Sequence, residues 1–461
     1  KPGACQPGQA ERLQAVSLLL DTEGEKINDA RMRILYNILL WIVAVPGLLF
    51  FLIKMLLTGK YRHSFLQKLG ARQKPLLAGI GPGPRIWIHA VSVGEVTAAQ
   101  PVVAALKKQR PEVKIIFSTS TETGQGMAQK LVSGADAFIY FPLDISFAVH
   151  RMLSLVRPDV FVLVETELWP NFLASCRARG VRVVLANGRI SPRSFDRYRR
   201  TRFFWKRALA DVNEAGMISQ VDAERICAIG LAKDKIQVMG NAKYDALASL
   251  VSSQLHEDTV RRFGVRPEEK FFVAGSTHPG EEDIVIRVYR ALADADPAFK
   301  LILAPRHVER AGEVQAALAR AGFPDIIRVS EIRAGRRRAA ERGILVDVIG
   351  ELFKVYSLAQ IVYCGGSLVP RGGQNILEAA AWGKVIFYGP SMEDFSQEAA
   401  LLEAAGAGVR ISGERELLEG MQRLLAAPEE LRVRGENGRA AVRANMGAAG
   451  RYAAMIVKHL A

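Results

Sequence analysis

The chain has 461 residues, of which 49% are hydrophobic and 24% are charged. This composition is typical of globular proteins and excludes disorder, collagen and coiled coil as the main architecture. The formal net charge of +15 indicates a polyanionic neighbour, which could be nucleic acid, an anionic membrane face or a phosphorylated substrate. The four cysteines show no zinc-ligand spacing and no dense disulfide framework, so we expect a reducing compartment.

The first 58 residues fall into two parts. Residues 1–31 are polar without clear periodicity and open with Lys rather than Met, so the sequence predicts a disordered or mis-assigned leader, with Met32 as the more natural start. Residues 34–57 form an apolar run that would span about 36 Å as a helix, enough to cross a bilayer core. We therefore predict a membrane anchor at residues 32–58, because a buried core helix rarely stays apolar for so long on every face. Basic residues are more frequent after the run, which predicts that the C-terminal part is cytoplasmic.

From Arg85 onward, short apolar runs alternate with helical segments. The runs of the first half are IWIHAV, VKIIFSTS, AFIYFPL, DVFVLVET, RVVLANG, GMIS and IQVMGN. After a polar helical stretch at about 246–269, the second half brings FFVAGS, KLILAPR, IIRVS, ILVDV, IVYCGG and VIFYG. Apolar strands alternating with helices predict parallel sheets covered on both faces, hence an α/β fold with two Rossmann-like domains at 59–245 and 246–461. Ligands of such sheets bind at the carboxyl ends of the strands.

Acidic residues follow two strands of the first half. HAVSVGE places Glu95 at a helix start, where it could be a capping acid or a functional carboxylate. ETELWPN places Glu165 and Glu167 after a buried strand, where acids are costly unless they are hydrogen-bonded or functional. Lys243, in VMGNAKYD, also follows a strand and could meet an anion, although a lone lysine is usually a surface residue.

A basic segment, RISPRSFDRYRRTRFFWKR, follows the strand VVLANG and places eight basic residues among aromatic ones. Nucleic-acid binding and attachment to an anionic membrane would both use such a mixture. A solvated helix face with a buried aromatic stripe would also explain it.

The second half ends its strands in small-residue turns. AGSTHPGEE opens a helix at Glu281, LAPRH carries Arg306 and His307, and VDVIGEL precedes a helix. The segment YCGGSLVPRGGQNILEAAAWG surrounds a Ser and an Arg with glycines before a helix that contains Glu378. Backbone amides of such a turn can bind phosphate, and Glu378 could accept ribose hydroxyls, so a sugar-nucleotide site is expected. Neither GxGxxG nor GxxxxGK[ST] occurs, which argues against an NAD-type or P-loop site.

Together, the motifs HAVSVGE, ETELWPN, NGRIS, GNAKYD, PRH, GEL and GGSLVPRGGQNILEAAAWG resemble the 3-deoxy-D-manno-octulosonic acid (Kdo) transferases of lipopolysaccharide synthesis. The resemblance runs from about Met32 to the C-terminus and does not cover the leader. It implies a membrane-anchored GT-B glycosyltransferase, with two Rossmann-like domains facing a cleft. It further implies transfer of Kdo from CMP-Kdo to a lipid A precursor (lipid IVA) at the cytoplasmic face of the inner membrane. No metal and no cofactor beyond the donor is implied.

The resemblance also assigns roles to residues. It implies that Glu95 is the general base and that Glu165 and Lys243 support the transition state. The residues it implies for CMP are Pro305, Arg306, Ile349, Gly350, Glu351, Asn375, Ile376, Leu377 and Glu378. The basic segment with Arg189 and Arg193 would meet acceptor phosphates and the anionic leaflet, so no nucleic-acid partner is expected.

Two other functions remain as alternatives. A GT-B enzyme that uses a UDP-sugar and a lipid acceptor would share the fold and the Gly-rich turn but need not have HAVSVGE or ETELWPN. A membrane-associated nucleic-acid binder would use the basic segment and leave Glu95 unexplained. The sequence does not determine the number of Kdo residues transferred, the acylation of the acceptor or the oligomeric state.

Overall fold

The computed structural model describes residues 34, 36–42, 62–339 and 341–460. Within these residues no helix combines the length and the apolar character needed to cross a membrane. The predicted leader lies outside the described residues, and so do most residues of the predicted anchor. Of the anchor, residue 34 and residues 36–42 are helical.

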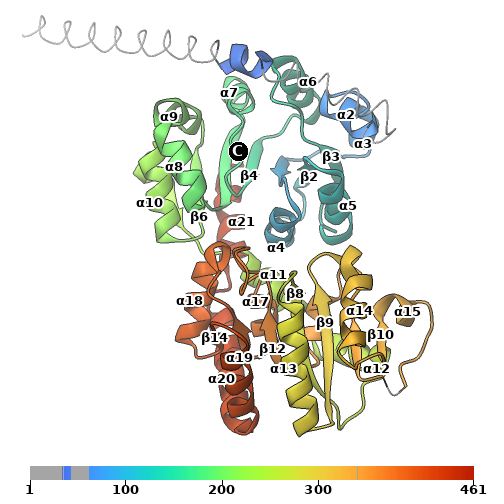
Figure 1. The fold of residues 1–461 in the computed structure, drawn as a ribbon. Helices are drawn as coiled ribbons and strands as arrows, with labels where there is room; N and C mark the ends of the chain where they lie inside the picture. The colour runs from blue at the N-terminus through green and yellow to red at the C-terminus, as the bar shows by residue number, and fades with distance from the viewer. Residues whose placement is uncertain (1–33, 35, 43–61, 340, 461) are drawn as a thin grey trace, which may run out of the picture. The chain divides into compact units, whose positions relative to one another are not determined.

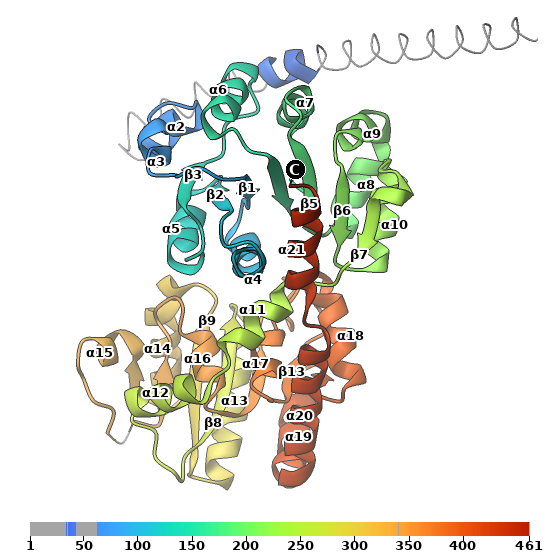
Figure 2. The same cartoon turned by 180° about the vertical axis from the view of Figure 1, so that it is seen from behind.

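The described chain divides into two compact units. The first unit runs to Ala242 and also includes residues from Ala448 onward, whereas the second unit is Lys243–Gly447. The predicted domain boundary at 245/246 is therefore close, but assigning everything after 246 to the second domain is wrong for the C-terminal helix. The physical reason is that helix α21 (Ala448–Lys458) buries Tyr452, Ala453 and Ile456 in a core of the first unit. Figure 2 shows α21 beside β5 and β6 of that unit.

The first unit is built on a seven-stranded sheet with the order β3-β2-β1-β4-β5-β6-β7, in which every pair is parallel (Figure 1). Its strands are β1 (Arg85–His89), β2 (Lys114–Thr119), β3 (Ala137–Tyr140), β4 (Val160–Val164), β5 (Arg182–Gly188), β6 (Glu214–Met217) and β7 (Ile236–Val238). Its helices, besides α21, are α2 (Arg62–Lys68), α3 (Lys74–Leu77), α4 (Val93–Gln109), α5 (Glu122–Leu131), α6 (Ser146–Val156), α7 (Pro170–Ala178), α8 (Pro192–Arg200), α9 (Arg202–Ala210) and α10 (Gln220–Ile229), with a 3-10 turn η1 (Lys233–Lys235).

Side chains of one strand alternate between two cores, one on each face of this sheet. On β1, Ile86 and Ile88 enter one core, whereas Trp87 enters the other, and all three are buried. This burial on both faces is the reason that the strands read as continuous apolar runs. Successive strands are added on one side of β1 up to β3 and then on its other side from β4, so the strand order reverses between β1 and β4, and the position beyond their carboxyl ends is where a ligand is expected.

The second unit repeats this plan with the strand order β10-β11-β9-β8-β12-β13-β14, again all parallel. Its strands are β8 (Lys270–Thr277), β9 (Phe299–Pro305), β10 (Ile326–Arg328), β11 (Gly343–Leu345), β12 (Ala359–Cys364), β13 (Ile386–Tyr388) and β14 (Gly408–Arg410). Its helices are α11 (Lys243–Leu250), α12 (Ser253–Phe263), α13 (Glu282–Ala295), α14 (Ala311–Arg320), α15 (Val329–Arg333), α16 (Leu352–Tyr356), α17 (Leu377–Ala381), α18 (Ser396–Ala404), α19 (Glu414–Leu425) and α20 (Pro428–Ala444), with 3-10 turns η2 (Val308–Arg310) and η3 (Glu393–Phe395). The α/β class with two parallel sheets is thus confirmed. Here the strand order reverses between β8 and β12.

Candidate active site

Glu95 combines a structural bond pattern with an unusual acidity. Ser92 is the N-cap of α4, and Glu95 closes a capping box: its carboxylate accepts hydrogen bonds from Val91 N–H (2.7 Å), Ser92 N–H (3.3 Å) and the Ser92 hydroxyl (2.9 Å). Only 5% of the residue is exposed. Burial raises the pKa of Glu95 to about 7, and the nearby carboxylates of Glu165 and Glu167 raise it as well, against the opposing hydrogen bonds of Val91 and Ser92. The capping interpretation is confirmed, and the same geometry leaves a carboxyl group that titrates near neutral pH.

The two acids of ETELWPN lie near Glu95 in the same unit. Glu165 directly follows β4 and has a φ of +60°, a left-handed conformation that non-glycine residues rarely adopt. Burial raises the pKa of Glu167, and the charge of Glu165 adds to this effect. Three carboxylates therefore interact at the carboxyl ends of β1 and β4, where burial and like charges raise the pKa values of Glu95 and Glu167.

The neighbouring loops of the first unit are fixed by bonds that the sequence did not reveal. Thr166 donates from its hydroxyl to the carbonyl of Arg189 (2.5 Å), which joins the loops after β4 and β5. Asn187, with a φ of +55°, accepts from Ala242 N–H (2.9 Å). Lys243 comes next and opens α11 in the second unit, so it is not part of the unit that carries the carboxylate cluster.

The basic segment forms α8 and α9, and its two kinds of side chain separate. Phe195, Tyr198 and Trp205 pack against a core of the first unit, as the buried aromatic stripe predicts. Most arginines on these helices are instead exposed, namely Arg193, Arg197, Arg199, Arg200 and Arg202, whereas Arg207 is partly buried. Phe203 is also exposed.

In the second unit, basic side chains gather at the carboxyl ends of β8 and β9. Burial lowers the pKa of His278, and the nearby His307, Arg371 and Arg306 lower it further, although Glu281 opposes them. The rings of His278 and His307 stand edge to face with centroids 5.8 Å apart. Arg306, whose N–H donates to the carbonyl of Thr277, was predicted for the site, whereas His278 and Arg371 were missed. Both residues could have been identified from the sequence, because His278 lies in STHPGEE and Arg371 in VPRGG, beside the glycines of the two strand-end turns.

The Gly-rich turn after β12 differs from the phosphate cradle that the sequence suggested. The amides of residues 366–368 all donate to the carboxylate of Glu281, at 2.7, 3.0 and 3.0 Å. The amides of Gly372 and Gly373 are bonded to Ser391 and to the carbonyl of Gly366. The turn is therefore filled from within the chain, and these amides do not point at an external anion.

Glu378 and Asn375 follow this turn. The Asn375 amide donates to the Glu378 carboxylate (3.1 Å), and its oxygen accepts from Leu377 N–H at the start of α17. Burial raises the pKa of Glu378 to about 7, and the bond from Asn375 opposes this increase. Ile376 and Leu377 are buried in a core, so Glu378 and Asn375 are the polar side chains of this predicted group.

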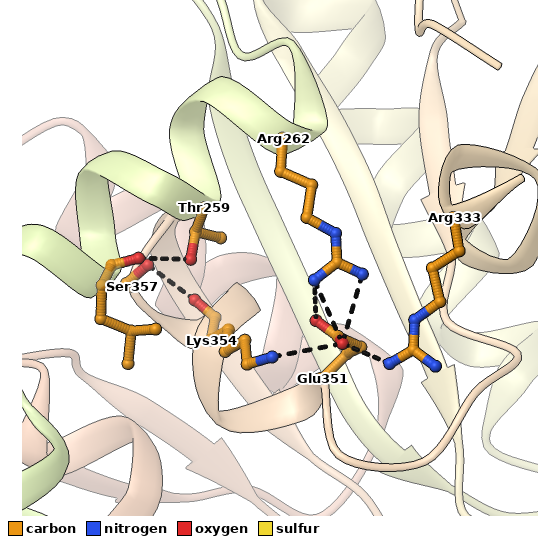
Figure 3. A network of polar contacts seen from close by, with 7 residues as sticks. Thr259, Arg262, Arg333, Glu351, Lys354 and Ser357 are labelled. Carbon is orange, nitrogen blue, oxygen red and sulfur yellow. Dashed lines mark hydrogen bonds and ion pairs between the residues drawn. The ribbon is translucent and has the colours of Figure 1, made fainter. Parts of the chain in front are cut away.

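The carboxylate of Glu351 forms ion pairs within the second unit and is buried, so a ligand cannot readily contact it (Figure 3). Its carboxylate, which is 1% exposed, bonds to Arg262 (3.1 Å), Arg333 (2.5 Å) and Lys354 (3.3 Å). Burial would raise the pKa of Glu351, but the three cations together hold it below its usual range. Of the predicted trio, Ile349 is 75% exposed and Gly350 has a φ of +87°, so Ile349 is the residue that a ligand can reach most readily.

No metal-binding cluster occurs in the part of the chain that the structure describes, in the sense that no three His, Cys, Asp or Glu side chains are suitably grouped there.

Comparisons with known proteins agree with these motifs. A family model described as 3-deoxy-D-manno-octulosonic-acid transferase (kdotransferase) matches residues 61–246. The 3-deoxy-D-manno-octulosonic acid transferase of Haemophilus influenzae is 30% identical over 429 residues, which are 93% of this chain and 99% of the relative. The enzyme of the same name from Bordetella pertussis is 31% identical over 379 residues, 79% of this chain and 84% of the relative.

Among solved structures, a UDP-GlcNAc 2-epimerase from Neisseria meningitidis bound to UDP-GlcNAc has a TM-score of 0.56 at 15% identity, covering 82% of this chain and 99% of that one, which shows a shared fold alone. The extent of the match to the Haemophilus relative decides the family. The chain belongs to the 3-deoxy-D-manno-octulosonic acid transferases, a family of glycosyltransferases.

Proposed function

We propose that the enzyme transfers Kdo from CMP-Kdo to a lipid A precursor, lipid IVA, in lipopolysaccharide biosynthesis. The acceptor hydroxyl attacks the anomeric carbon of Kdo, the bond from that carbon to the phosphate oxygen breaks, and CMP leaves. The hydroxyl proton passes to a base on the enzyme. Family membership supports the Kdo transfer, and the chemistry of the strand ends supports the assignment of roles.

Glu95 is the base of this proposal, and its acidity is the observation that carries it. A general base acts best when its pKa lies near the working pH, and burial together with two carboxylates raises that of Glu95 to about 7. Glu95 follows β1 at the point where the strand order reverses to β4, and ligands of such sheets bind there. Glu165, held in a left-handed conformation after β4, supports the transition state through its charge, which raises the pKa of Glu95.

The second unit holds the donor in this proposal. The CMP phosphate meets Arg306 and Arg371 rather than the filled Gly-rich turn, because a guanidinium suits a phosphate. Glu378 accepts the ribose hydroxyls, and Pro305, Ile349 and Gly350 contact the nucleotide. Lys243 or a nearby arginine pairs with the Kdo carboxylate. Positive side chains then stabilise the leaving phosphate without a metal or a further cofactor.

The enzyme acts at the cytoplasmic face of the inner membrane, with residues 32–58 as its anchor. The helical residues 36–42 support this assignment, because their apolar side chains are largely exposed, including Ile38 (51%) and Ile42 (62%). Two polar groups instead bind the first unit: Tyr36 donates to Asp144 (2.8 Å), and Asn37 pairs with Asn171. The exposed arginines of α8 and α9 belong to this same unit and would face anionic lipid or the acceptor phosphates.

A single titration separates this proposal from its alternatives. We expect CMP to bind much more tightly than UDP or an oligonucleotide, whereas preference for UDP would favour a UDP-sugar enzyme.

Transfer should continue in EDTA, and a loss of activity that Mg²⁺ restores would contradict the metal-free mechanism. The mass of the product formed from lipid IVA would give the number of Kdo residues added.

A further inference from the structure

Glu281 is a completely buried carboxylate at the turn between β8 and α13. One of its oxygens accepts from His278 N–H (2.9 Å) and Gly366 N–H (2.7 Å). The other accepts from the N–H groups of Ser367 and Leu368 (3.0 Å each) and from the Tyr363 hydroxyl (2.8 Å). Five donors therefore converge on one side chain, and they come from two loops more than 80 residues apart in the sequence.

All five groups donate to the Glu281 side chain, so the side chain at residue 281 has to be an acceptor with two oxygens. A carboxylate fits this requirement. Four of them are backbone N–H groups, which cannot reverse their direction. Consecutive N–H groups in such a loop form a concave anion site. A buried carboxylate is costly unless donors surround it, and here they do. No Lys or Arg forms an ion pair with Glu281 among the contacts of the described residues, so the loop amides are its main partners.

The loop that Glu281 holds is short and tightly packed. Gly366, with a φ of +67°, accepts a hydrogen bond from Gly373 N–H (2.9 Å), so residues 366–373 close on themselves. A Cβ atom at Gly365 would come within 2.6 Å of the Thr277 backbone and 2.9 Å of the Glu281 carboxylate. Gln374 and Asn375 directly follow this closed loop in the sequence, and Glu378 lies three residues after Asn375. The positions of Asn375 and Glu378 therefore depend on how the loop is held.

We propose that Glu281 is a positioning residue for the donor site, which rests on the proposed function. Its carboxylate is the internal acceptor of the Gly-rich loop. It fixes residues 366–368 against the turn that carries His278, and the loop in turn places Asn375 and Glu378. Glu281 itself touches no substrate.

The matched control is the next residue. Glu282 is also buried and begins the same helix, but its carboxylate pairs with Arg310 (2.7 Å) and contacts none of the loop amides. Comparing Glu281→Ala with Glu282→Ala therefore separates loss of the loop anion from loss of a buried acid at this helix start.

The test is titration of CMP by calorimetry, with and without formate, on the full chain. We expect Glu281→Ala to weaken CMP binding by at least about tenfold, because loss of hydrogen bonds to a charged acceptor shifts an equilibrium by that order. Formate, which can fill the vacated anion site, should restore most of the affinity, and formamide should not. The KM for CMP-Kdo should rise while the KM for acceptor stays constant. Glu282→Ala should show no formate effect.

Other outcomes overturn the proposal. If Glu281→Ala binds CMP as tightly as the wild type does, the proposal is wrong. It is also wrong if Glu281→Ala and Glu282→Ala lose affinity equally and formate does not restore it, because that result indicates general destabilisation. If Glu281→Ala does not fold, Glu281→Gln decides: its NH₂ group would face N–H donors, so weaker CMP binding is expected and unchanged binding refutes the role. Amide hydrogen exchange of residues 366–368 is a second measurement that needs no CMP. In Glu281→Ala we expect formate to slow this exchange. It therefore tests Glu281 even if wild-type enzyme fails to bind CMP and the proposed function is wrong.

Discussion

Glu95→Gln separates the structural role of Glu95 from its catalytic role. The substitution keeps the size of the side chain and one carbonyl oxygen, which can accept from Ser92, whereas the bond from Val91 N–H to the other carboxylate oxygen is lost at every pH. It removes the ionisable group that burial and two carboxylates disfavour in the folded state. We therefore expect the variant to become relatively more stable as the pH rises, while it loses activity.

The size of the effect follows from the pKa. Folding raises it from 4.5 to about 7, and each pH unit of difference corresponds to about 1.4 kcal/mol. A raised folded-state pKa means that the stabilising contribution is complete below about pH 4.5 and is lost as the pH rises to about 7. The wild type thus loses up to about 3 kcal/mol of unfolding free energy across this range, and the Gln variant does not.

Denaturant unfolding followed by tryptophan fluorescence is the assay. Trp87 lies completely buried on β1, and four of the five tryptophans belong to the first unit, so the emission reports mainly on the unfolding of that unit. The stability difference between variant and wild type should grow in favour of the variant between pH 4.5 and 7 and then level off. As a control, Glu112→Gln removes an exposed acid whose pKa Arg110 lowers, and it should show no such gain. A difference that does not change with pH would refute the raised pKa.

The same variant tests catalysis. A general base contributes roughly 10²- to 10⁴-fold, so Glu95→Gln should lose that factor mainly in kcat. CMP affinity should be unchanged, because the proposed nucleotide residues belong to the second unit. A variant that keeps more than about a tenth of the rate would leave Glu95 only its capping role.

Three further predictions concern other parts of the chain. CMP affinity of the wild type should fall as the pH drops below about 7 and Glu378 takes up its proton, whereas Glu378→Gln should bind weakly at every pH in calorimetry; equal pH profiles would contradict the ribose assignment. Charge reversal of Arg197, Arg199 and Arg200 should raise the apparent KM for acceptor at low salt and less at high salt, since each contact contributes on the order of 1 kcal/mol and is screened; kinetics unchanged at both ionic strengths would make the arginines a solvated face. Tyr36→Phe removes the bond to Asp144, so limited proteolysis should separate the segment that carries residue 36 from the rest of the first unit faster than in the wild type; an unchanged rate would count against this attachment.

The sequence predicted strands well because both sheets are buried on two faces. Each predicted apolar run contains a strand, and the run IWIHAV contains β1 with Trp87 and Ile88 on opposite faces. The edge strand β14 was missed, since its three residues Gly408–Arg410 carry a glycine and an arginine and bury little apolar surface. Burial pattern was the signal, and it is weakest at the edge of a sheet.

Long-range bonds explain what the sequence did not predict. The hydroxyl of Tyr452 donates to the carbonyl of Gly240 (2.7 Å), 212 residues earlier, and nothing in the composition of the last helix marks this return to the first unit. In the same way, the Gly-rich turn has the composition of a phosphate cradle. Only its contact with Glu281 shows that it already holds an anion.

Each unit carries a carboxylate after the strand at its reversal point. The hydrogen-bond donors around the two carboxylates differ, and this difference separates a structural role from a catalytic one. Glu95 follows β1 and Glu281 follows β8, the strands at which the strand order of each sheet reverses. A carboxylate offers about four acceptor positions. Glu281 receives five donors from two loops and so has no capacity left for a substrate proton. Glu95 receives three, all from its own turn, which leaves room for the hydroxyl that it would deprotonate. The same position thus serves as a scaffold in one unit and can act as a base in the other.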